Sequence, residues 1–326
     1  MSIVASEHQI KLEYETAQFL QSLFGDDLSE LKYLEEKLRV RTVTRDGWLL
    51  VRGGEEECEL TRQIFEDLEQ ARRGGMDLTG SYFRTAVDLH LAGAGEGVTD
   101  LTRVKLVGAK GRKPVMARSP SQLNYLKQMM ENEVVFGLGP AGTGKTYLAV
   151  AMALHLLQKK EIQRIILTRP AVEAGEALGF LPGDLKEKVA PYLRPLYDAI
   201  DDMIGYEEGA ARLDDGSIEI APLAYMRGRT LSRSFVILDE AQNTTEEQMF
   251  MALTRLGEGS RAVITGDGSQ VDLRGKQQSG LFEAEVALKG VQGVAFSRFD
   301  ASDVVRHPVV GRIIKAYDAY RADDVS

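Results

Sequence analysis

The residues best suited to bind a charged ligand form one glycine-rich run, Gly139-Pro140-Ala141-Gly142-Thr143-Gly144-Lys145-Thr146. The run fits the pattern G-x-x-x-x-G-K-[ST], in which glycines let backbone N–H groups approach phosphate oxygens. An apolar segment at 133–137 precedes it, and a helical pattern at 146–158 follows it. The positive end of that helix would face the phosphates. The sequence therefore predicts a P-loop that binds ATP.

The side chains of this run have distinct expected tasks. The Lys145 ammonium would contact the β- and γ-phosphates, and the Thr146 hydroxyl would be a ligand of Mg²⁺. A glycine-rich turn that binds nothing is the alternative, and the flanking strand and helix argue against it. The expected nucleotide-binding residues of the run are Gly139, Pro140, Ala141, Gly142, Thr143, Gly144, Lys145, Thr146 and Tyr147.

Two carboxylates, Asp239 and Glu240, follow the apolar segment 235–238. If that segment is a strand of a parallel sheet, its carboxyl end points into the ligand crevice. Asp239 would then hold Mg²⁺ through water, and Glu240 would orient or deprotonate the attacking water. Acidic residues often follow strands without any function. The upstream P-loop favours the catalytic interpretation here.

A polar segment, 266–270, follows another apolar stretch and ends in Gln270. The neutral amide of Gln270 both donates and accepts hydrogen bonds. It could contact the γ-phosphate or the attacking water and so distinguish ATP from ADP. An ordinary turn is the alternative, and a shared crevice with the P-loop favours the sensor role.

Arg306, Arg298 and Arg169 are candidates for an arginine finger, a cation that can accelerate phosphoryl transfer by about 10³–10⁵. Spacing alone does not separate the three, and a solvated arginine is the alternative for Arg306. Gln122 lies upstream of the predicted P-loop strand. It could read an adenine edge, although a polar residue on a helix face explains it better.

The elements that must position these residues are short apolar segments alternating with helical patterns. Such alternation predicts a parallel sheet covered by helices on both faces, an α/β fold. The predicted strands are 133–137, 164–168, 235–238, 262–265 and 291–297, and the predicted helices are 146–158, 246–255, 280–288 and 308–320.

The N-terminal residues have a different organisation. Alternating and helical patterns between residues 9 and 75 predict the order β-α-α-β-β-α, with a hairpin turn at Arg45-Asp46-Gly47. Residues 76–115 lack sustained periodicity, apart from a short helix near 82–91. The predicted organisation is a domain at 1–75, a linker at 76–115 and a P-loop domain at 116–326.

Composition excludes several classes of protein. The chain has 326 residues, a formal net charge of −9 and 44% hydrophobic residues, which indicates a globular protein without a general coat of basic charge. Its one cysteine cannot form an internal disulfide. No signal-peptide core or membrane-spanning run is visible. We therefore expect a cytoplasmic protein without a membrane partner.

With these motifs in view, the sequence resembles the PhoH-like family of P-loop ATPases over about residues 116–321. The resemblance rests on GPAGTGKT (139–146), LDEAQNTT (238–245), TGDGSQVDL (265–273), VVRHPVV (304–310) and the long stretch 168–200. It implies a RecA-like core similar to superfamily 1 helicases. It also implies an adenine-reading Gln122, a γ-phosphate-sensing Gln270 and an Arg306 finger, which requires a ring-like homo-oligomer such as a hexamer.

The N-terminal element order resembles a type I KH domain. Such domains grip a nucleic-acid backbone with a G-x-x-G loop between their first two helices. Here that loop reads Gly25-Asp26-Asp27-Leu28, which lacks the second glycine and carries two carboxylates that would repel phosphate. A more favourable phosphate contact is the linker cluster, although a solvated basic loop explains it equally well; the cluster is Lys105, Lys110, Arg112 and Lys113.

The leading hypothesis is a cytoplasmic ATPase that couples ATP hydrolysis to RNA binding, remodelling or processing in a homo-oligomer. The alternative is a nucleotide-dependent switch that regulates a partner such as an endoribonuclease, without unwinding. A small-molecule kinase is a third hypothesis, but the sequence has no obvious acceptor lid.

Overall fold

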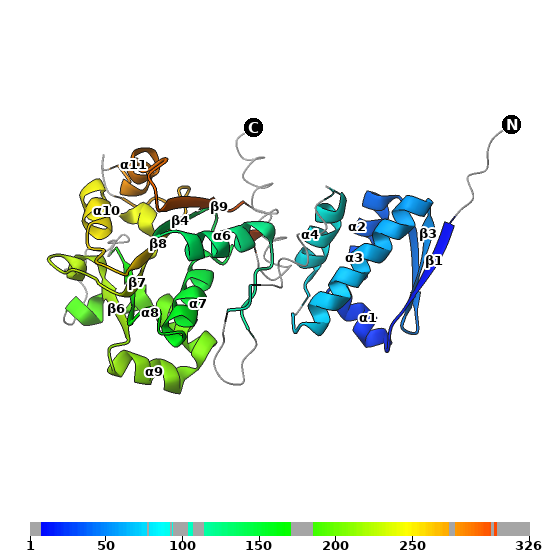
Figure 1. Cartoon of the computed structure of the whole chain (residues 1–326), viewed down its shortest axis with the longest axis horizontal. Coiled ribbons are helices and arrows are strands. Elements are labelled where there is room, and N and C mark those ends of the chain that lie inside the picture. Colours follow the sequence, from blue (N-terminus) through cyan, green and yellow to red (C-terminus); the bar gives the residue numbers. More distant parts are fainter. Residues whose placement is uncertain are drawn as a thin grey trace, which may run out of the picture. The chain divides into compact units, whose positions relative to one another are not determined.

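The computed structural model describes residues 8–76, 78–91, 93, 104–106, 114–170, 185–273, 278–300 and 303–304, with the side chains of 185–192 left out. The chain divides into two compact units. The first is Met1–Leu106 with Lys113–Leu123, and the second is Val107–Arg112 with Asn124–Ser326 (Figure 1).

The first unit combines a small antiparallel sheet with helices. In chain order its elements are β1 (His8–Glu13), α1 (Ala17–Leu23), α2 (Ser29–Leu38), β2 (Arg41–Arg45), β3 (Trp48–Gly53), α3 (Glu55–Arg73) and α4 (Gly80–Leu91). Strand β3 is central and pairs antiparallel with β1 and β2. The predicted β-α-α-β-β-α order is thus present from β1 to the end of α3.

Local sequence sets the boundaries of these elements. The Thr16 hydroxyl accepts a hydrogen bond from the Phe19 amide at 3.0 Å and so caps α1. Asp46 and Gly47 connect β2 to β3 with φ values of 47° and 84°. A two-residue hairpin turn requires these positive values at both positions, as the sequence predicted.

Helices cover one face of the small sheet. Leu49 and Val51 of β3 are fully buried on that face, against α1 and α3 (Figure 1). Helix α4 packs on α2 and α3, where the Phe83 ring lies edge-on to Phe24 and Phe65. Buried aromatic contacts of this kind tie α4 to the core of the first unit.

The second unit is built on a parallel sheet. From the start of α6 the elements are α6 (Pro120–Glu131), β4 (Val134–Leu138), α7 (Lys145–Gln158), β5 (Arg164–Arg169), α8 (Leu185–Ile204), α9 (Tyr206–Asp214), β6 (Ile218–Pro222), η2 (Leu223–Met226), β7 (Ser234–Leu238), η3 (Ala241–Asn243), α10 (Glu246–Leu253), β8 (Arg261–Gly266), α11 (Gly280–Ala287) and β9 (Val294–Arg298). The strand order is β6-β5-β7-β8-β4-β9, and each pairing is parallel.

Alternate residues of the strands face opposite layers of helix. Phe136, Val236 and Ile264 belong to a core that α10 and α11 close with Met249 and Leu281. The other face packs on α7, which contacts β5, β7 and β8. The predicted α/β class, a RecA-like parallel sheet with helices on both faces, is confirmed.

Three described elements were absent from the sequence prediction, namely α8, α9 and β6. Strand β6 is short and ends in Pro222, which is compatible with its place at the edge of the sheet. The predicted helix 308–320 lies outside the described residues.

In the part of the chain that the structure describes, no helix is both long and apolar enough to cross a membrane.

Candidate nucleotide-binding site

The glycine-rich run connects β4 to α7, as predicted, and turns sharply at three glycines. Gly139, Gly142 and Gly144 have φ values of 145°, 85° and 84°, a region that L side chains rarely adopt. A Cβ atom on Gly139 would lie 2.4 Å from the carbonyl oxygen of Phe299. The backbone of this loop can therefore approach a ligand closely.

The Lys145 side chain lies in the concavity of the loop and is 7% exposed. Its Nζ donates hydrogen bonds to the carbonyl oxygens of Gly139 and Pro140, both at 2.7 Å, and to Thr143 Oγ1 at 3.4 Å. Burial lowers the pKa of Lys145, while the nearby charges of Asp267, Glu240 and Asp239 oppose that shift. Only those three acidic groups oppose it, so a phosphate would find a partly desolvated cation here.

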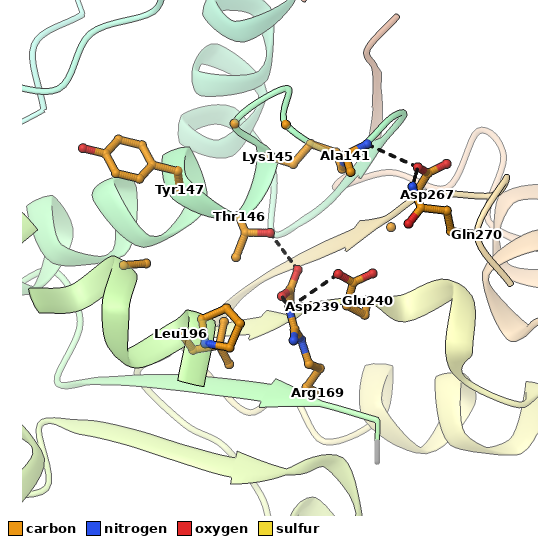
Figure 2. A pocket seen from close by; sticks show the side chains of 15 residues that line it. Ala141, Lys145, Thr146, Tyr147, Arg169, Leu196, Asp239, Glu240, Asp267 and Gln270 are labelled. Carbon is orange, nitrogen blue, oxygen red and sulfur yellow. Dashed lines mark hydrogen bonds and ion pairs between the residues drawn. The ribbon is translucent and has the colours of Figure 1, made fainter. Parts of the chain in front are cut away.

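Asp239 joins the P-loop helix to the neighbouring strands. Its Oδ1 accepts hydrogen bonds from Thr146 Oγ1 at 2.7 Å and from Thr265 Oγ1 at 2.6 Å (Figure 2). Its Oδ2 accepts from Arg169 Nη2 at 2.6 Å and from Arg169 Nε at 3.1 Å. The carboxylate is 4% exposed, and these charge-assisted bonds offset the cost of burying it.

Glu240 follows in a left-handed conformation, with φ 54° and ψ 40°. This backbone is costly for a residue other than glycine, and such strain is often found at functional sites. Its Oε2 accepts from Gln242 Nε2 at 2.6 Å, and its Oε1 lies 3.4 Å from Arg169 Nη2. Gln242 also accepts the Asp267 amide through Oε1, at 3.0 Å. Gln242 thereby connects Glu240 to the segment that follows β8.

That segment contains the predicted sensor. Gln270 Nε2 donates to Asp267 Oδ2 at 2.7 Å, and the same oxygen accepts the Ala141 amide of the P-loop at 3.2 Å. Burial alone would raise the pKa of Asp267. Hydrogen bonds from Ser269, the Lys145 charge and the Ala141 amide together lower the pKa instead. The sensor segment is therefore in contact with the loop that would hold the phosphates.

These groups surround a pocket of about 320 Å³. Figure 2 shows Thr146, Asp239, Glu240 and Arg169 pointing toward one another across it. One wall is apolar and comes from α8; the lining residues are Ala141, Gly142, Gly144, Lys145, Thr146, Tyr147, Arg169, Pro195, Leu196, Ala199, Asp239, Glu240, Gly266, Asp267 and Gln270. Polar groups at one side of a concave, partly apolar pocket are typical of a ligand site.

The donor atoms in the pocket suit Mg²⁺. The described residues contain no cluster of three or more His, Cys, Asp or Glu side chains that could hold a metal ion alone. Thr146 and Asp239 instead offer one hydroxyl and one carboxylate side by side. Mg²⁺ prefers such oxygen ligands and usually keeps waters and substrate phosphates as its others. These two residues fit the predicted metal role.

Other predicted residues lie elsewhere. Gln122 belongs to the first unit and is 4% exposed, with its Oε1 accepting the Arg118 amide at 2.8 Å. Its adenine-reading role stays a prediction. Arg298 forms an exposed ion pair with Glu285 of α11. Arg306 lies outside the described residues.

Sequence reasoning gave too little weight to several side chains. Arg169 was only one of three arginine candidates, yet it contacts both predicted catalytic carboxylates. Thr265, Asp267 and Gln242 had no predicted role. Their only signal in the sequence was position, since each follows or ends a predicted strand close to a motif. The linker cluster cannot be judged in full, since only Lys105 of it is described, with Nζ 3.3 Å from the Gly74 carbonyl oxygen.

The strand order adds the last feature needed to classify the unit. Strand β8 lies between β4, which leads into the P-loop, and β7, which ends at Asp239. The carboxyl ends of these three parallel strands therefore meet at one pocket. Fold and site together define a P-loop NTPase with a RecA-like core.

The chain belongs to the PhoH-like protein family, whose model matches residues 114–318. It is 49% identical to a PhoH-like protein of Bacillus subtilis over 298 residues, which is 91% of this chain and 93% of that protein. A PhoH-like protein of Mycobacterium tuberculosis is 44% identical over 91% of this chain and 84% of its own length. The predicted family is thus confirmed.

Among solved structures, the UvsW helicase from bacteriophage T4 superposes with a TM-score of 0.38 and 13% identity. The match covers 61% of this chain and 64% of that one. A similarity at this level supports no inference about activity.

Proposed function

We propose that this chain binds ATP with Mg²⁺ in the pocket between the P-loop and Asp239, and that it hydrolyses the γ-phosphate bond. The observation that carries the proposal is the 2.7 Å hydrogen bond from Thr146 Oγ1 to Asp239 Oδ1. Residues 93 positions apart in the chain meet there, with the oxygen types that a metal-bound triphosphate needs.

The tasks of the side chains follow from their geometry. Lys145 and the loop amides would bind the phosphates, and Thr146 and Asp239 would hold Mg²⁺, which when bound neutralises charge on the phosphate oxygens. Glu240 would accept a proton from the attacking water. Its side chain is 43% exposed to the pocket side, and Gln242 fixes one of its oxygens. Gln270 would respond to the γ-phosphate through Asp267.

We further propose that hydrolysis is coupled to RNA binding, remodelling or processing in a cytoplasmic homo-oligomer. The support is the KH-like element order of the first unit and the single P-loop core in the described chain. A motor with one core per chain needs neighbouring subunits, for example in a hexameric ring. Arg306 of one subunit would then complete the site of the next. The proposed domains remain 1–75 and 116–326, joined by 76–115.

Steady-state ATP turnover with and without single-stranded RNA tests this proposal, alongside a sizing measurement. The wild type should turn over ATP faster with RNA and should elute as an oligomer. Glu240→Gln should lower turnover by about 10²-fold or more, because a general base contributes at least that much. Undiminished hydrolysis in Glu240→Gln would remove Glu240 from its role.

A nucleotide-dependent switch gives a different outcome in the same assay. It would hold ATP, show no RNA stimulation and bind a protein partner, such as an endoribonuclease, only with ATP present. That result would replace the motor proposal and leave the ATP site intact.

A further inference from the structure

The solvent face of the small sheet in the first unit has an unusual composition. Pairing across the strands places Glu13, Trp48 and Arg45 in one row, and Lys11, Leu50 and Val43 in the next. A third row contains Gln9, Arg52 and Arg41. All nine side chains point away from the helices, because their neighbours Leu49 and Val51 are buried on the other face.

This face is basic on an acidic chain. It carries Lys11, Arg41, Arg45 and Arg52 against one carboxylate, Glu13, whereas the whole chain has a net charge of −9. The Lys11 and Glu13 side chains pair at 2.6 Å, and Arg45 pairs with Asp46 of the hairpin turn at 3.1 Å. Arg52 Nε donates to Gln9 at 2.9 Å, and no ion pair of Arg41 occurs among the described residues. Positive charge is thus left over across the sheet.

The same face also presents apolar groups to solvent. Trp48 and Leu50 are partly exposed in the central strand, and Val43 beside them is 52% exposed. Lys11 Nζ lies 5.4 Å from the centroid of the Trp48 ring, a cation–π contact. An antiparallel sheet with one wet face ordinarily shows polar side chains there. An aromatic ring within a field of cations is instead the combination used to stack and hold unpaired bases.

The opposite surface of this unit is poorly suited to that task. The loop between α1 and α2 carries Asp26 and Asp27, and a Cβ on Gly25 would lie 2.5 Å from the Gly80 amide nitrogen of α4. Glu30 of α2 is 4% exposed and pairs with Arg84 of α4 through both carboxylate oxygens, at 2.7 Å and 2.9 Å. Helix α4 therefore closes the loop at which a KH domain would grip a phosphate backbone.

We propose that the exposed sheet face of the first unit, centred on Trp48, is a binding platform for single-stranded nucleic acid. A base stacks on the Trp48 indole, and the four basic side chains around it contact the phosphates. The platform extends the proposed function, because it names where RNA contacts the chain outside the P-loop unit. Binding is measured without ATP, so failure of the platform leaves the hydrolysis proposal untouched.

The test uses the full chain and its single tryptophan. Intrinsic fluorescence is titrated with an oligouridine, with a DNA of equal length, with a duplex RNA and with vesicles containing an anionic lipid. Quenching that saturates with either single strand, and that weakens as salt rises, supports the platform. Equal quenching by the duplex or by the vesicles overturns it. So does binding of labelled oligouridine, seen by anisotropy, that leaves Trp48 fluorescence unchanged.

Variants locate the binding by anisotropy of labelled oligouridine. Trp48→Ala should weaken binding by about tenfold, and Trp48→Phe, which keeps a ring, by less. Arg41→Gln/Arg52→Gln should weaken binding and flatten its salt dependence by about 0.7 per lost phosphate contact. The control Lys32→Gln/Lys37→Gln removes equal charge from α2, on the loop side. Equal loss in that control would overturn the proposal, and circular dichroism melting excludes misfolded variants.

Discussion

At the scale of single residues, the candidate site depends on one buried carboxylate with several partners. Asp239 accepts hydrogen bonds from two hydroxyls and one guanidinium, and each donor comes from a different element. A buried charge is tolerated only when it is paired in this way. The loss of any partner therefore affects the position of the carboxylate that would hold Mg²⁺.

The Arg169 guanidinium is the strongest cation acting on this carboxylate. Replacement by alanine would leave Asp239 and Glu240 adjacent without their cation. We expect Arg169→Ala to lower kcat by about tenfold to a hundredfold, without raising the Mg²⁺ concentration needed for half-saturation. Arg169→Lys should recover only part, because an ammonium cannot donate in a fixed fork. Steady-state turnover over a Mg²⁺ titration measures both quantities.

Arg298→Ala is the matched control, because Arg298 forms an exposed ion pair and does not line the pocket. Its kcat should stay near that of the wild type. Full activity in Arg169→Ala would show that its contacts with the carboxylates have no catalytic role.

Asp267 makes a pH-dependent contribution to stability. Its folded-state pKa lies below the ordinary value of 3.8, so its stabilisation is complete above that value. The contribution is lost as pH falls through the lower folded-state pKa. The difference in melting temperature between wild type and Asp267→Asn should therefore be constant from about pH 7 to 5 and shrink below about pH 4. A difference that grows on acidification would contradict the charged, hydrogen-bonded Asp267.

At the scale of elements, the close approach of α4 to the loop after α1 is a packing feature with a direct test. Gly25 has φ +70°, and an added Cβ would meet Gly80 and Thr79 backbone atoms at 2.5 Å and 2.8 Å. Gly93 has the same φ but no heavy atom within 4 Å of an added Cβ. Both alanine variants carry similar backbone strain. Only Gly25→Ala should also lose packing.

We expect Gly25→Ala to destabilise the first unit by about 1–3 kcal/mol more than Gly93→Ala, the usual cost of forcing extra atoms into a packed site. Urea unfolding can be followed by alkylation of Cys58, which is fully buried and whose pKa burial raises. Equal destabilisation by both substitutions would show that α4 does not press on this loop.

The elements differ in how much the sequence revealed about them. Strands such as β7 were predictable because five apolar residues in a row are buried on both faces. Strand β6 was missed because Glu219 and Pro222 interrupt its pattern at the edge of the sheet. Helix α4 was predicted, but its packing was not, since Phe83 shows its partners only once α2 and α3 are folded.

The same limit applies to the site. The P-loop, Asp239 and Glu240 were predictable because their order along the chain is fixed by local motifs. The contacts of Arg169 were not, because it reaches Asp239 across 70 residues of chain. Pairing of neighbouring strand ends, not sequence spacing, brings these two together.

At the scale of the whole molecule, the two units have different surfaces and different chemistry. The second unit gathers its charged groups into one pocket, where acidic and basic side chains are paired. The first unit leaves uncompensated positive charge on the exposed face of its sheet. Net charge conceals this difference, because an acidic chain can still hold a local basic surface.

Calorimetry of Mg²⁺·ATP binding tests the central claim most directly, with Glu240→Gln used so that the nucleotide persists during the titration. The account predicts saturable heat with one nucleotide per P-loop, dependent on Mg²⁺ and abolished or strongly weakened when Lys145→Ala is added. An absence of heat and affinity in Glu240→Gln, or unchanged affinity after the loss of Lys145, would contradict it.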